Sequence, residues 1–207
     1  HHFCDYIVSA PPVVLAAVAE RTSTIRVGTA VALGTNNDPI RQAEDYATLD
    51  VLSDGRVELV VGRGNLYEHT FAAFGQDPKV SRQMYQEKLS LLVEALRNEQ
   101  IDWQGEYRAP FRNFTTQPRP VQNPLPVWVG GGSSIESAEF AAHAGLPRML
   151  PGVFGPPEIF TDIVGRYREL WAQLEHPEDE CRVGTIAHTF IAPTSQEAFD
   201  VSGPRFE

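Results

Sequence analysis

Hydrophobic and polar positions alternate along the chain between two periods, one typical of strands and one typical of helices. Short runs rich in β-branched residues predict five strands, at 25–31, 56–62, 127–129, 148–150 and 183–192. Helical spacing or helix-start signals predict helices between them, at 12–22, 39–52, 81–96, 134–143 and 157–174, and a helix start at 195–200. The chain therefore reads as an alternation of helices and strands.

Strict alternation implies parallel strands covered by helices, because a crossover helix returns the chain to start the next parallel strand. Two architectures fit this order. A closed (β/α)8 barrel needs eight strands, of which five are visible, whereas a doubly wound sheet needs only five or six. We expect one domain over residues 1–207, with a loop excursion at 100–124, where Gln, Pro, Arg and aromatic residues gather.

Composition limits the partners. The net charge of −10 argues against general nucleic-acid binding, because no excess of cations is present to neutralise phosphates. No apolar run approaches the roughly 18 residues of a membrane span. Cys4 and Cys181 lie far apart and fit a reducing compartment better than a disulfide framework. These features predict a cytoplasmic protein with no membrane or nucleic-acid partner.

The strongest local signal is a predicted strand that runs through three glycines into a helix. Gly130, Gly131 and Gly132 allow a ligand to approach the backbone, and the helix that follows offers free N–H groups and a positive dipole end. Ser134 and Ser137 add hydroxyl donors. This pattern favours a phosphate site; the alternative is a plain loop in which Ser134 is only the helix N-cap.

Two arginines are further phosphate candidates. Arg63 follows a predicted strand between Gly62 and Gly64, at the carboxyl end where parallel barrels hold their sites. Arg82 lies in the first turn of its helix, where a cation opposes the helix dipole unless an anion is bound. The alternative for each is an ordinary surface arginine, ion-paired in the case of Arg82. Arginine's planar fork of donors suits phosphate.

His1 and His2 open the chain and are candidates for general acid/base or hydrogen-bonding roles. The alternative is a tag remnant. They have no partners at metal-ligand spacing, so we expect no metal site.

Taken in order, several segments resemble the bacterial luciferase-like, flavin-dependent monooxygenase family. The resemblance extends to about residue 195 and is weak in each motif but specific in their order and spacing. The matching pieces are His1-His2-Phe3, Ala19–Thr22, Ile25–Val31, Pro39–Asp45, Leu49–Arg56, Gly62–Gly64, Phe74-Gly75, Ser81-Arg82 and Gln117-Pro118.

The resemblance implies a (β/α)8 barrel that uses reduced FMN from a separate flavin reductase, together with O2, on a small organic substrate such as an aldehyde. It implies phosphate contacts from Arg63, Arg82, Ser134 and Ser137. It places Ala30-Val31 beside the flavin ring, often through a non-proline cis peptide. His1 resembles the family's active-site histidine, with His2 as its neighbour. By resemblance the full-length protein is a homodimer.

The chain also departs from the family. Gly62 stands where luciferase has a cysteine, Asp38 stands where a histidine is common, and Val201–Glu207 does not resemble the family. The family implies first strands before His1 and a C-terminal strand and helix after residue 200, so we expect an incomplete barrel fragment. Two alternatives remain: an F420-dependent hydride-transfer oxidoreductase and a non-catalytic flavin-binding homologue.

Overall fold

The computed structural model describes residue 2 and residues 7–64, 68–132 and 134–205. The main feature of this part of the chain is a parallel sheet in the strand order β1-β2-β5-β6-β7. Its strands are β1 Val27–Leu33, β2 Val57–Gly62, β5 Val127–Gly130, β6 Arg148–Leu150 and β7 Val183–Thr185. All five strands expected from the sequence are present, although β1 and β7 differ from expectation at their ends.

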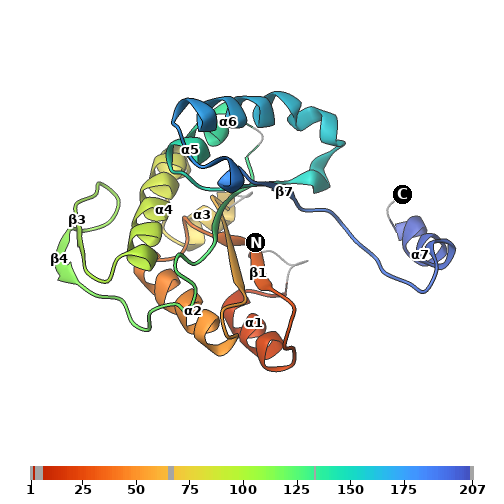
Figure 1. Cartoon of the computed structure of the whole chain (residues 1–207), viewed down its shortest axis with the longest axis horizontal. Helices are drawn as coiled ribbons and strands as arrows, with labels where there is room; N and C mark the ends of the chain where they lie inside the picture. The colour runs from red at the N-terminus through yellow and green to blue at the C-terminus, as the bar shows by residue number, and fades with distance from the viewer. Residues whose placement is uncertain (1, 3–6, 65–67, 133, 206–207) are drawn as a thin grey trace.

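Helices alternate with these strands as expected, and in Figure 1 the larger ones run in an arc from α1 through α2 and α4 to α5 and α6. These five are α1 Pro11–Glu20, α2 Pro39–Leu52, α4 Ser81–Arg97, α5 Ile135–His143 and α6 Thr161–Gln173. The shorter helices are α3 Glu68–Ala73 and α7 Ser195–Ser202, with 3-10 turns at Pro78–Val80, Gly152–Phe154, Pro157–Phe160, Glu178–Glu180 and Gly203–Arg205.

The order of the strands distinguishes the two architectures that fit the sequence. Each main strand pairs with the next main strand along the chain, so the sheet grows in one direction only. A doubly wound sheet reverses direction at a switch point, and this sheet does not. The winding is that of a (β/α) barrel, in which successive parallel strands are added at the same edge.

The core lies between the sheet and the helices. Val57, Leu59 and Val61, at alternating positions of β2, are fully buried and belong to the same apolar cluster as Leu89 and Leu92 of α4. The apolar stripe of α4 is therefore buried as its period predicts, and β2 is buried on both faces, as expected for a strand inside a parallel sheet. Each such side chain contributes about 1.5–3 kcal/mol on burial.

The excursion at 100–124 contains a small sheet that the sequence did not indicate. Strand β3, Ile101–Trp103, pairs antiparallel with β4, Phe111–Phe114. Three of the four β4 residues are exposed, so no alternating apolar face marks the strand.

The expected strand at 183–192 is wrong in length, because β7 ends at Thr185. Its partner β6 ends at Leu150, and Pro151 follows. One further hydrogen bond joins the Ile186 N–H to the Leu150 carbonyl, at 2.9 Å. A β-branched run forms a strand only as far as a neighbouring ladder extends.

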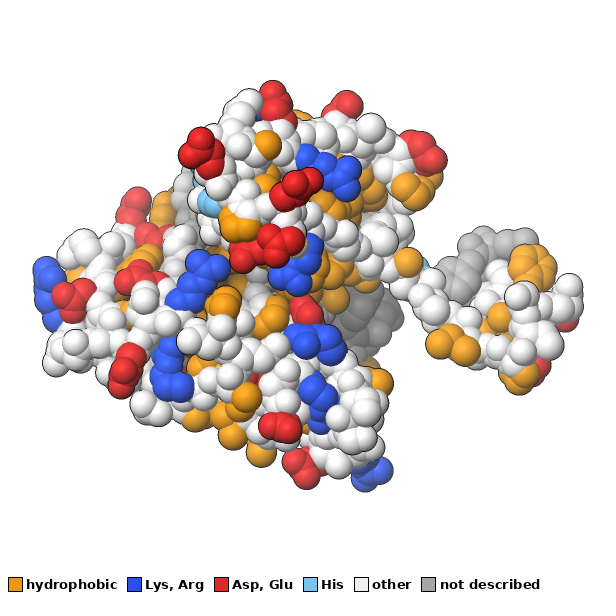
Figure 2. All heavy atoms as spheres, in the orientation of Figure 1, with side chains coloured by type: hydrophobic (Ala, Val, Ile, Leu, Met, Phe, Trp, Pro, Cys, Tyr) orange, Lys and Arg blue, Asp and Glu red, His pale blue; other side chains and the backbone are white. Residues whose placement is uncertain are grey.

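The helix start expected at 195–200 is confirmed as α7, which stands apart from the sheet in Figure 1. Figure 2 shows apolar side chains on its surface, and Phe199 is 68% exposed. None of the described helices is both long and apolar enough to cross a membrane.

Candidate functional site at the carboxyl ends of the strands

The carboxyl ends of the first three strands of the sheet meet at one rim. Gly62, at the end of β2, pairs with Leu33 of β1 on one side and with Gly130 of β5 on the other. The Gly131 N–H donates to the Met149 carbonyl of β6, at 3.0 Å. Parallel barrels hold their sites at this end. Arg63 follows directly on β2, and Gly131 follows directly on β5.

Val31 crosses this rim from β1. The Ala30-Val31 peptide is cis, as the family resemblance implied, and the pairing of β1 with β2 shifts register between Ala30 and Ala32. The methyl carbons of Val31 reach over the two neighbouring strands. A Cβ at Gly62 would lie 2.7 Å from one of them, and a Cβ at Gly130 would lie 2.5 Å from the other. The two glycines therefore make room for Val31.

The glycine turn leads into the N-terminus of α5. Gly131 and Gly132 have φ values of 75° and 76°, which favour glycine. Ser134 is the N-cap of α5, and its Oγ accepts the Ser137 N–H at 3.3 Å. Ser134 is therefore the helix N-cap. This hydrogen bond uses its oxygen as an acceptor, so its hydroxyl can still donate to an anion.

An anionic group already occupies this helix N-terminus. The Glu136 side chain lies at this N-terminus, where its own backbone N–H and the Ser134 hydroxyl favour the charged carboxylate and lower its pKa. Arg82 Nη1 lies 3.5 Å from its Oε2. The backbone N–H, then Ser134, then Arg82, hold the pKa of Glu136 below its ordinary value. The ends of α4 and α5 therefore converge on one anion.

Arg82 and Arg63 differ in their surroundings. Arg82 is half exposed and paired with Glu136, so the ion-pair alternative for it is present in the structure. Arg63 is exposed directly after β2, and its carbonyl accepts the Thr35 hydroxyl at 2.8 Å. Within the described ranges its guanidinium has no ion pair or hydrogen bond.

Sequence reasoning missed Arg148, which lies behind the glycine turn. This β6 residue is fully buried, and it donates from Nη1 to Ser137 Oγ at 3.2 Å and from Nη2 to the Gly132 carbonyl. Burial lowers its pKa to about 10. The sequence signal was its place two residues before Leu150 on a strand whose alternate positions are buried.

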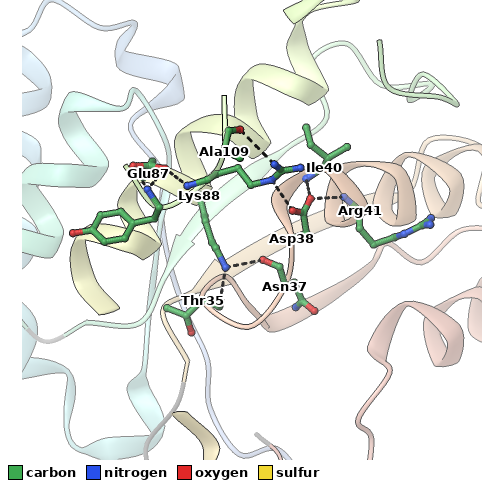
Figure 3. Close-up of polar contacts among 10 residues, drawn as sticks. Thr35, Asn37, Asp38, Ile40, Arg41, Glu87, Lys88 and Ala109 are labelled. Carbon is green, nitrogen blue, oxygen red and sulfur yellow. Dashed lines mark hydrogen bonds and ion pairs between the residues drawn. The ribbon is translucent and has the colours of Figure 1, made fainter. Parts of the chain in front are cut away.

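The loop between β1 and α2 borders the same rim and is held by α4 (Figure 3). Lys88 Nζ donates to the carbonyls of Thr35, at 2.6 Å, and Asn37, at 3.2 Å. Burial lowers the pKa of Lys88. Asp38 caps α2 by accepting the Ile40 N–H at 3.0 Å, and its other oxygen accepts from Arg108 at 2.7 Å. Asp38 is therefore a cap and an ion-pair partner.

Of the two candidate histidines, His1 lies outside the described residues. His2 is described, and its ring packs on that of Phe74, with ring centroids 4.6 Å apart. Burial lowers the pKa of His2. Among the described residues, no group of three or more His, Cys, Asp or Glu side chains is arranged to hold a metal ion.

Comparisons with known proteins point to one family. Residues 1–205 match the luciferase-like monooxygenases, so the match continues beyond residue 195 and includes most of the tail that was expected to differ. The chain is 28% identical over 183 residues to the alkanal monooxygenase alpha chain of Aliivibrio fischeri, covering 85% of this chain and 51% of that one. It is 26% identical over 210 residues to the oxygenase component of the flavin-dependent trigonelline monooxygenase of Acinetobacter baylyi, covering 96% and 55%.

Solved structures agree. The crystal structure of the monooxygenase RslO1 from Streptomyces bottropensis superposes with a TM-score of 0.88 at 29% identity, covering 99% of this chain and 62% of that one. The chain thus spans only about half to three fifths of the length of its relatives. With its barrel winding and the match along nearly its whole length, the chain belongs to the luciferase-like monooxygenase family.

Proposed function

We propose that the protein is a flavin-dependent monooxygenase that uses reduced FMN and O2 to oxidise a small organic substrate such as an aldehyde. The observation that carries this proposal is the set of donors around the Glu136 carboxylate. Arg82, the Ser134 hydroxyl and a backbone N–H of α5 already bind one anion there. A phosphate group has the charge and acceptor oxygens to use the same donors.

The remaining rim residues fit the rest of the cofactor. No atom lies within 4 Å of the place where a Cβ of Gly131 would stand, so a ligand has access to the backbone there. Val31 supplies an apolar surface over β2 and β5 for a flat ring. Arg63 brings a cation that has no ion pair among the described residues. Ser137 brings a hydroxyl that Arg148 orients. We assign the phosphate to Arg63, Arg82, Ser134 and Ser137, and the flavin ring to Ala30 and Val31.

When bound, the reduced flavin supplies the electrons and activates oxygen, and the protein binds, orients and excludes water. We assign His1 to positioning the substrate or assisting proton transfer, with His2 beside it. The low pKa of His2 keeps this imidazole neutral near pH 7, which suits a hydrogen-bonding role. The name of the relative from Acinetobacter baylyi, an oxygenase component, supports a separate reductase as the source of reduced flavin.

Titration of the purified protein with reduced FMN under anaerobic conditions tests this proposal. We expect saturable binding, and the absence of binding up to millimolar FMN would refute it. Arg82→Ala should weaken FMN binding by about tenfold and leave riboflavin binding unchanged, because a charge-assisted contact to phosphate is lost. Equal losses for the two ligands would remove Arg82 from the phosphate site.

Oxygen uptake separates the proposed activity from its two alternatives. A monooxygenase consumes O2 with substrate and reduced FMN, and transfer of the 18O label from O2 to product can be measured by mass spectrometry. An F420-dependent oxidoreductase would turn over substrate without consuming O2. A non-catalytic flavin-binding homologue would bind FMN and turn over no substrate from a panel of aldehydes.

A further inference from the structure

Arg148 is a buried cation with no negative partner in the described part of the chain. Its side chain is fully buried, and its pKa of about 10 keeps it charged near neutral pH. No carboxylate there lies within ion-pair distance of its guanidinium. Buried charges are costly and are normally paired, so an unpaired one requires an explanation.

The neighbouring tyrosines do not neutralise it. Tyr85 donates its hydroxyl to the Val61 carbonyl at 2.8 Å, and Tyr167 donates to the Leu146 carbonyl at 3.1 Å. Burial raises the pKa of both hydroxyls, so both rings stay neutral at physiological pH. The positive charge of Arg148 is therefore left without compensation on this side.

The hydrogen bonds of Arg148 hold its guanidinium against the glycine turn. One Nη donates to the Gly132 carbonyl before α5, and the other donates to the Ser137 hydroxyl in the first turn of α5. Its Nε is buried and has no hydrogen-bond partner among the residues that the structure describes. Arg148 thus joins the two sides of the turn from behind, next to a helix N-terminus whose dipole is also positive.

We propose that Arg148 is a positioning residue for the cofactor's phosphate, which fixes the Gly132 and Ser137 sides of the turn and supplies a buried counter-charge to a phosphomonoester dianion. This proposal rests on the proposed FMN function. It explains why a charge is kept in an apolar layer, because a bound dianion supplies the negative partner that no described carboxylate provides. It also makes the site select phosphorylated flavin over riboflavin.

The experiment compares dissociation constants for FMN and riboflavin in the wild type and in Arg148 variants. Arg148→Met, which conserves bulk and removes the charge, should reduce the preference for FMN over riboflavin by at least about tenfold, which corresponds to about 1.4 kcal/mol of lost stabilisation of the dianion. Arg148→Lys should recover part of that preference. Arg166→Met is the matched control, because Arg166 already pairs with Glu139 and Glu169; it should leave the preference unchanged.

Arg148→Gln, which removes the charge and keeps an N–H donor, serves as the second variant if the methionine variant does not fold. An unchanged preference for FMN in the folded variants, or an equal loss of affinity for FMN and riboflavin, overturns the role of Arg148. Either result leaves the proposed function standing. A wild type that binds both flavins equally also overturns it. A wild type that binds no FMN refutes the proposed function itself.

Discussion

Val31 fills the space that a side chain at position 62 would need, since a Cβ on Gly62 would lie 2.7 Å from a Val31 methyl carbon. The two residues come from neighbouring strands, β1 and β2, at the rim of the sheet. This contact gives a physical reason for glycine at position 62. The side chain at position 31 therefore limits which side chains fit at position 62.

We expect Gly62→Cys to lower the free energy of unfolding by about 1–3 kcal/mol through overpacking. Combining it with Val31→Ala should recover more than about 1 kcal/mol of the cysteine's cost, because the methyl groups that clash are gone. Urea unfolding of the two single variants and the double variant measures the coupling. Additive costs would show that Val31 is not the obstacle.

Gly165→Ala should stabilise the protein, in contrast to Gly62→Cys. Gly165 lies within α6, is exposed, and has no atom within 4 Å of the place where its Cβ would stand. Alanine should therefore raise the free energy of unfolding by about 0.5–1 kcal/mol through its helix propensity. The same urea experiment checks this, and a decrease in stability would contradict the open space described for this position.

Lys88→Met should lower the free energy of unfolding by about 1–3 kcal/mol, because the buried Thr35 carbonyl loses the ammonium that it shares with the more exposed Asn37 carbonyl. Lys79→Met is the matched control, since Lys79 is exposed and just precedes α4. It should change stability by less than about 0.5 kcal/mol. Similar losses in both variants would show that the buried hydrogen bonds of Lys88 contribute little.

Glu136→Gln should strengthen FMN binding by about two- to fivefold, the range for one exposed ion pair. The carboxylate competes with phosphate for Arg82 and for the N-terminus of α5. Riboflavin affinity should stay unchanged in an equilibrium titration. Weaker FMN binding in this variant would mean that Glu136 supports the phosphate site rather than competing with it.

The pKa of His2 should lie below 6.5, because burial disfavours its charged form. Between that lowered pKa and 6.5 the unfolded chain binds more protons, so this group's contribution to stability is lost as the pH falls through the window. Phe74→Ala should raise the pKa toward 6.5 by exposing the ring. Phe154→Ala, at an exposed phenylalanine, is the control. Titration of the imidazole by NMR measures both variants.

The sequence was sufficient to predict the elements that carry a clear apolar pattern of their own. The stripe containing Met84, Leu89 and Leu92 predicted α4, and the β-branched run at 56–62 predicted β2. It was insufficient where pairing decides the outcome, as at β7, which ends where β6 stops offering hydrogen bonds. The antiparallel hairpin of β3 and β4 has little apolar alternation and was missed for the same reason.

The candidate site was also predicted only in part from the sequence. Arg82 and Ser134 were found because their positions at helix starts are visible in sequence, and the structure brings both to Glu136. Arg148 was missed because a charged residue at the start of a short strand resembles a surface position. Its burial depends on α5 and on the two tyrosines around it, which come from distant segments.

Gly131 and Gly132 make the glycine turn of this site selective for the chirality of its residues. Both hold φ near +75°, in the half of conformational space that is natural to D-amino acids and unfavourable to L-residues with a side chain. At these two adjacent positions the genetic code offers one achiral residue and no good substitute. A semisynthetic protein with D-alanine at position 131 would keep the backbone path of the turn, whereas L-alanine would strain it.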